Sequence, residues 1–84
     1  MTAEALVLLT DDELDAMTAR AYREAARAWT EYRRACNRRA GTVYGTPEAL
    51  RALRDALYTD ATEAEDYWRH LSQSLAGRRA EAGR

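Results

Sequence analysis

The second half of the chain carries a long, regular apolar pattern that constrains the fold more than any other feature. Apolar side chains recur there at intervals of three or four residues: Leu50, Leu53, Leu57, Ala61, Ala64, Trp68, Leu71 and Leu75. This spacing puts them on one side of an α-helix. Thr46 and Pro47 precede the pattern in the order typical of an N-cap and a first helical residue, and Gly77 follows it. The pattern predicts a helix over about residues 47–76.

A second amphipathic pattern lies earlier in the chain. Its apolar and small residues also follow a heptad: Leu14, Thr18, Ala21, Ala25, Ala28, Tyr32 and Ala35. Thr10 and Glu13 have the spacing of a capping box, in which each side chain accepts a hydrogen bond from the other residue's backbone N–H. Gly41 is suited to a left-handed C-cap. We therefore expect a helix over about residues 11–40.

Two helices of about 30 residues are each roughly 45 Å long, and a short loop over residues 41–46 favours antiparallel packing. The predicted fold is all-α: an antiparallel two-helix hairpin, similar to a coiled coil, over residues 10–76. Residues 1–9 are expected to form a short apolar segment that packs on the open end of the hairpin. Residues 77–84 are expected to form a polar, flexible tail.

The apolar sector of the first helix is wider than a two-helix seam requires, because Met17, Tyr22, Trp29 and Cys36 extend it. A chain of 84 residues also buries a thin core. Both observations predict that two hairpins associate into a homodimeric four-helix bundle. Arginines dominate the loop end and carboxylates the open end, so we expect the basic end of one hairpin to meet the acidic end of the other.

Composition restricts the function classes. All 13 basic residues are arginine, which indicates coding bias in a GC-rich bacterial genome, and the net charge of -1 gives no overall attraction to nucleic acid or anionic membrane. The apolar run at residues 6–9 is too short for a signal peptide or a membrane span. A single cysteine, Cys36, excludes an internal disulfide and fits a reducing cytoplasm, where we expect the protein to reside.

An arginine cluster near the loop is a candidate site for phosphates or for an acidic partner. It consists of Arg33, Arg34, Arg38, Arg39, Arg51 and Arg54. Its members could bind nucleic acid at the tip of the hairpin, which is the main alternative function. Arginines at a helix C-terminus also stabilise the helix dipole without any ligand, and no helix-turn-helix pattern is present.

The sequence offers little for catalysis or metal binding. His70 lies one turn after Asp66 and two turns after Glu63, on the side of its helix away from the leucines. A metal site usually needs enclosure and more ligands, so a small metal-dependent enzyme is the weakest alternative. Cys36 has no histidine nearby in the hairpin. We therefore expect no enzyme activity, no catalytic residues, no metal and no cofactor.

The aromatic residues are the most suggestive feature, since tyrosine and tryptophan suit surfaces that a protein partner buries. Tyr22, Trp29 and Tyr58, together with Met17, are the predicted interface residues. Closing the core of the hairpin itself is an equally good interpretation of these rings. The leading hypothesis is a non-enzymatic protein–protein interaction module that serves as a regulator, adaptor or assembly subunit. A homodimer, and a further protein partner besides, are the expected associations.

Overall fold

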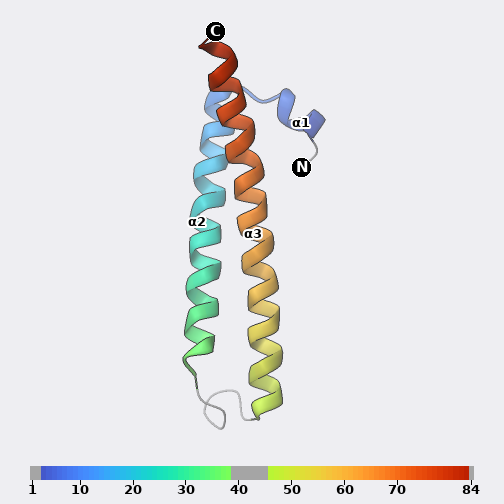
Figure 1. Cartoon of the computed structure of the whole chain (residues 1–84), viewed down its shortest axis with the longest axis vertical. Coiled ribbons are helices and arrows are strands. Elements are labelled where there is room, and N and C mark those ends of the chain that lie inside the picture. Colours follow the sequence, from blue (N-terminus) through green and yellow to red (C-terminus); the bar gives the residue numbers. More distant parts are fainter. Residues whose placement is uncertain (1–2, 39–45, 84) are drawn as a thin grey trace.

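The structure, a computed structural model, describes residues 3–38 and 46–83 and contains three helices in those ranges. They are α1 (Ala3–Val7), α2 (Asp11–Cys36) and α3 (Pro47–Ala82). The long helices α2 and α3 run side by side in opposite directions, and the short helix α1 lies beside the last turns of α3 (Figure 1). This arrangement confirms the prediction of an all-α antiparallel hairpin.

The predicted cap at the start of α2 is present. The hydroxyl of Thr10 accepts a hydrogen bond of 3.1 Å from the backbone N–H of Glu13, and the Glu13 carboxylate accepts one of 3.1 Å from the N–H of Thr10. At the start of α3, Thr46 accepts a bond of 3.1 Å from the N–H of Ala49, with Pro47 as the first helical residue. Both helices therefore begin where their capping residues predict.

The end of α2 differs from the prediction. The helix ends at Cys36 and not near Ala40, and Asn37 is its C-cap residue. The guanidinium of Arg54, on α3, donates to the carbonyls of Ala35 and Cys36, at 3.1 and 3.3 Å. The Ala35 carbonyl also accepts a hydrogen bond of 3.2 Å from the backbone N–H of Arg38, so the acceptors at the end of α2 are satisfied without a further helical turn. Gly41, the predicted C-cap, lies outside the described residues.

The predicted end of the second helix near Ala76 is wrong, because α3 continues through Gly77 to Ala82. The additional turns make contacts that hold them in place. Arg78 pairs with Asp11 at 3.1 Å, and Arg79 lies 3.5 Å from Asp15. Residues 77–82 are therefore part of the hairpin and not a flexible tail. Gly77 does not stop the helix, because the cost of a helical glycine is only about 1 kcal/mol.

The core has two parts of different character. At the open end, leucines form a cluster with Ala21, and Met17, Leu9 and Trp68 pack against it; the buried members are Leu6, Leu14, Ala21, Leu71 and Leu75. Toward the loop the buried seam is narrower and mostly alanine, with Ala25, Ala35, Leu50 and Ala61. Among the described residues, only Leu14 and Leu71 are large side chains with essentially no exposure. Large buried side chains therefore stabilise the open end of the hairpin more than the loop end.

Helix α1 lies on its own chain. Its residue Leu6 is buried in the leucine cluster, and the guanidinium of Arg78 donates to the carbonyls of Leu6 and Leu9. Val7 and Leu8 remain exposed. Arg78 therefore contacts one carbonyl in the last turn of α1 and one just after the helix while it pairs with Asp11, and one side chain fixes the N-terminal segment to α3. In the part of the chain that the structure describes, no helix is long and apolar enough to cross a bilayer.

Gly77→Ala tests the helical state of the last turns. A Cβ at Gly77 would meet no heavy atom within 4 Å, so alanine fits without strain. We expect the free energy of unfolding to rise by about 1 kcal/mol, and the thermal midpoint by about 5 °C, at equal chain concentration. Thermal unfolding followed by circular dichroism measures both. An unchanged or lower midpoint would contradict a continuous helix at this position.

The capping box predicts how the stability of the hairpin changes at acid pH. The N–H of Thr10, and then its hydroxyl, lower the pKa of Glu13 below its ordinary 4.5. Because the folded pKa is the lower one, the stabilisation is complete above the unfolded pKa and is lost as the pH falls through the folded value. Glu13→Gln keeps the accepting oxygen but cannot titrate. The difference in thermal midpoint between wild type and this variant should shrink between neutral and acid pH; a constant difference would contradict the assignment.

Candidate protein-interaction face

Five aromatic rings form two clusters across the seam between α2 and α3. In one cluster Trp29 meets Tyr32 and Tyr58 with ring centroids 5.8 and 5.9 Å apart, and Tyr32 and Tyr58 are 5.4 Å apart. In the other, Tyr22 meets Trp68 edge to face at 5.4 Å. Edge contacts of this kind are favourable beyond the apolar area that they bury. The rings therefore join α2 to α3 within one chain.

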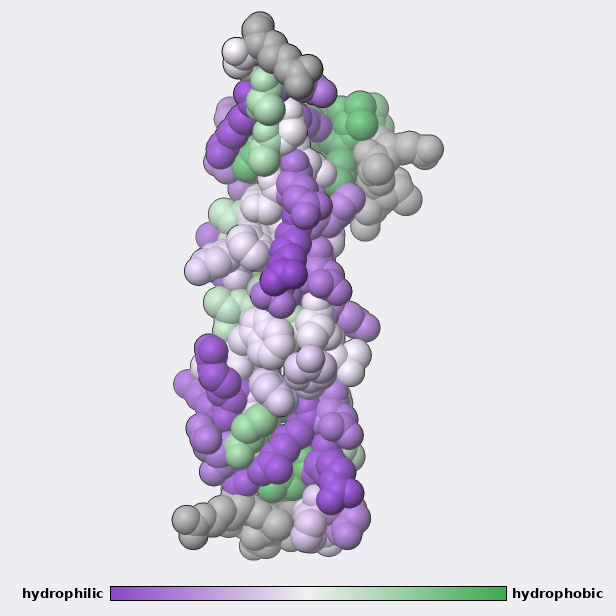
Figure 2. Space-filling view, in the orientation of Figure 1, coloured by the Kyte–Doolittle hydropathy of each residue, from purple (hydrophilic) through white to green (hydrophobic). Residues whose placement is uncertain are grey.

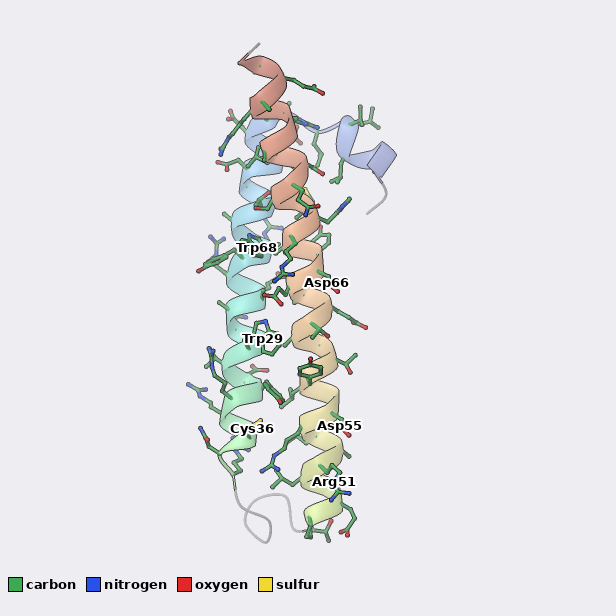
Figure 3. The ribbon with its side chains drawn as sticks, in the orientation of Figure 1. Trp29, Cys36, Arg51, Asp55, Asp66 and Trp68 are labelled. Atoms are coloured by element: carbon green, nitrogen blue, oxygen red, sulfur yellow. The ribbon has the colours of Figure 1, made fainter. Side chains whose placement is uncertain are left out.

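The small residues of the seam explain where the rings lie. Ala25 and Ala61 are buried between the helices, at 5 % and 0 % exposure, and side chains of this size leave no space there for an indole or a phenol. The rings consequently cover the seam from one side. Figure 2 shows pale side chains of intermediate hydropathy across the middle of this side, at the height where Figure 3 labels Trp29, with hydrophilic side chains above and below.

The rings are only partly covered by their own chain. Tyr22 and Tyr58 keep 57 % and 50 % of their surface exposed, despite their ring contacts. A groove of about 220 Å³ runs between the two clusters. Its lining consists of Tyr22, Ala25, Ala26, Trp29, Arg33, Glu65 and Trp68. We call the two ring clusters together with this groove the aromatic face. It offers rings at the centre, with a guanidinium and a carboxylate at the margin.

Three of the four predicted interface residues, Tyr22, Trp29 and Tyr58, lie together on the aromatic face. Met17 does not: it packs against the leucine cluster and lines a groove with Arg20 and Tyr67 that is separate from the aromatic one. Sequence reasoning missed Glu65, Tyr32 and Trp68 as members of the face. The heptad pattern assigned the rings of Tyr32 and Trp68 to the seam between the helices. The many alanines in the same pattern could have corrected this, because they bring the helices too close together to leave space for a ring.

The arginine cluster is divided by the structure. Arg54 binds the end of α2. Its guanidinium donates to the carbonyl of Arg38 at 2.9 Å, in addition to those of Ala35 and Cys36. Arg33 borders the aromatic groove, whereas Arg34 and Arg38 line a groove of about 310 Å³ with Leu53 and Leu57. Arg51 is exposed on α3. Arg39 lies outside the described residues.

The other candidates are surface residues. Glu63, Asp66 and His70 are all exposed on α3. Among the residues that the structure describes, no three histidine, cysteine or acidic side chains are placed to hold a metal ion. Cys36 is an exposed free thiol one turn after Tyr32, and a hydrogen bond with it raises the pKa of the Tyr32 phenol.

Comparison of the chain with protein-family models, with curated proteins and with solved structures gave no significant match.

The structural role of Arg54 can be separated from a binding role. Arg54→Met keeps the aliphatic stem but removes charged hydrogen bonds to three carbonyls, so we expect a loss of about 2 kcal/mol in unfolding free energy. Arg51→Met is the matched control, one turn earlier on α3 and exposed, and should change stability by less than about 0.5 kcal/mol. Chemical denaturation measures both. Equal stability of the two variants would contradict the cap.

Proposed function

We propose that this chain is a non-enzymatic protein–protein interaction module that acts by burying its aromatic face against another protein. A small regulator, an adaptor or a subunit of a larger assembly would work in this way. In its simplest form two hairpins associate through these faces into a four-helix bundle, and further partners bind the outer surfaces of the pair. The bundle is an arrangement in which long amphipathic hairpins bury the remaining apolar surface.

The half-exposed ring set carries this proposal. Tyr22 and Tyr58 are large side chains with about half of their surface in contact with solvent. Tyr22 lines the groove together with Trp29 and Trp68, and Tyr58 contacts Trp29. Tyrosine and tryptophan are enriched among the residues that contribute most to binding energy, because their rings bury a large apolar area while the polar tip keeps a hydrogen bond. A charged margin around such a centre is typical of protein interfaces.

The thin core supports the same conclusion. Of the nine buried apolar residues in the described part of the chain, four are alanines. A small hairpin with so few large buried side chains has little stability of its own, since chains of this size lose almost as much free energy in conformational entropy as burial supplies. Burying the aromatic face against a partner would add apolar area where the seam is narrowest. Association would then stabilise the fold as well as transmit a function.

The test replaces the exposed rings and preserves the helix. Tyr22→Gln combined with Tyr58→Gln removes both rings, and glutamine is well tolerated in helices. We expect the dissociation constant for self-association, measured by sedimentation equilibrium, to rise about 100-fold or more, because each ring should contribute at least about 1.4 kcal/mol. Circular dichroism should show unchanged helicity.

Tyr67→Gln is the matched control. It removes an exposed tyrosine of α3, 36 % exposed, that lines the groove with Met17 and Arg20 and not the aromatic one. This variant should associate like wild type. Equal association of the double variant and wild type would refute the assignment of the interface to the aromatic face.

A further inference from the structure

The two long helices carry opposite charge over the stretch where they lie side by side. On α2, the segment from Arg20 to Arg34 holds five arginines and two glutamates. On α3, the segment from Asp55 to Trp68 holds five carboxylates and no basic residue: Asp55, Asp60, Glu63, Glu65 and Asp66. The hairpin therefore has a basic side and an acidic side that run along its length.

Among the described residues little of this opposite charge is neutralised, since Glu65 is the one member of either segment in an ion pair. The ion pairs of the described residues are Arg69–Glu65, Arg78–Asp11 and Arg79–Asp15. The first lies within α3 and the other two lie at the open end, so none of them joins the basic segment of α2 to the acidic segment of α3. Both segments can still pair with charges on another molecule. A second copy of the same chain offers both signs at the same spacing.

We propose that the aromatic face is covered by a second copy in which α2 of each chain packs on α3 of the other, with both loops at the same end. This inference rests on the proposed function and names the partner and its orientation. The two-fold axis then runs parallel to the rod, and each helix has only antiparallel neighbours, as in an up-down-up-down bundle. The orientation differs from the pairing of basic with acidic ends that the sequence led us to expect.

Charge decides between the two ways of placing one aromatic face on the other. If the second copy were turned end over end, α3 would lie on the partner's α3, and two segments with five carboxylates each would face one another. Like charges that are juxtaposed across an interface cost several kcal/mol. With the loops at the same end, the acidic α3 of each chain lies on the basic α2 of the partner, and Arg33 is the arginine of that segment that lines the aromatic groove. Only this orientation combines the burial of the rings with opposite charges.

The register identifies a specific contact. Arg54 of α3 reaches the carbonyl of Ala35 on α2, so Arg33 and Asp55 are at nearly the same height on the two helices. Arg33 lines the aromatic groove, and Asp55, which Figure 3 labels on α3, precedes Tyr58 by one turn in the sequence. A two-fold axis parallel to the rod preserves height. Arg33 therefore faces the partner's Asp55, and the same pair is formed twice in the dimer.

The single thiol reports the orientation directly. Cys36 is exposed and lies two turns after Trp29 on α2, near the loop end (Figure 3). With loops at the same end, both thiols are at the same height on the inward side of one bundle, within reach of a short bismaleimide. In the end-over-end arrangement the two-fold axis would cross the rod at about the level of Ala26, about ten residues from Cys36 in each chain. At 1.5 Å per residue, the two thiols would then be roughly 30 Å apart along the rod. We expect efficient covalent dimer formation by the wild-type chain, and none by Cys36→Ser.

Charge reversal tests the contact. Arg33→Glu and Asp55→Arg should each weaken the dimer about tenfold, and the doubly reversed chain should recover to within about threefold of wild type. Arg34→Glu is the matched control. It makes the same change of charge in the last turn of α2, where arginine interacts with the helix dipole, but Arg34 lines a groove away from the aromatic face. It should leave the dissociation constant within about threefold of wild type.

The outcomes separate this inference from the proposed function. A dimer that does not cross-link through Cys36, and that the reversed charges leave unaffected, overturns the orientation. The proposed function still stands in that case if the double glutamine variant weakens association. A chain that stays monomeric in sedimentation overturns the second copy as the partner. Recovery in the doubly reversed chain supports the inference, because a purely local loss of stability would accumulate and not cancel.

Discussion

The close packing of α2 and α3 along a seam of small residues determines most of this structure. Alanines such as Ala25 and Ala61 allow the two backbones to approach, and in doing so they exclude the large rings from the space between the helices. The rings must then lie over the seam on one side, where they join the helices but stay half exposed. The small size of the side chains in the seam thus leaves aromatic rings half exposed on the outside of the hairpin. In the proposed function these rings bind the partner, so the residues that set the packing of the hairpin would also shape its interaction surface.

Two arginines on α3 hold the ends of the hairpin. Arg54 donates to the last carbonyls of α2 near the loop, and Arg78 donates to carbonyls of the α1 segment at the open end. In both cases a cation on another helix donates to carbonyls at or just after a helix C-terminus, where acceptors outnumber the backbone donors. A chain with a thin core benefits from such contacts, because fraying at either end would expose a large fraction of its few buried residues.

The periodic parts of the fold could be predicted from the sequence, and its ends could not. Heptad spacing and the caps at Thr10 and Thr46 are local, so they identify both long helices and where these begin. The ends of α2 and α3 depend on arginine contacts across the hairpin; the Arg78 contacts join residues 67 to 72 positions apart, and no local pattern reports such a distance. The aromatic site was predicted in part. Its rings were recognisable at the edge of each helix, but which of them share a face depends on the rotation of one helix against the other.

The central claim is that the aromatic face is buried against a second chain. The most direct measurement is the molar mass in solution, by light scattering coupled to size exclusion at low and at high salt. The account predicts twice the 9.5 kDa chain mass at both, because ring burial supplies most of the affinity and charge mainly sets orientation. A mass of one chain at every concentration and salt would contradict it.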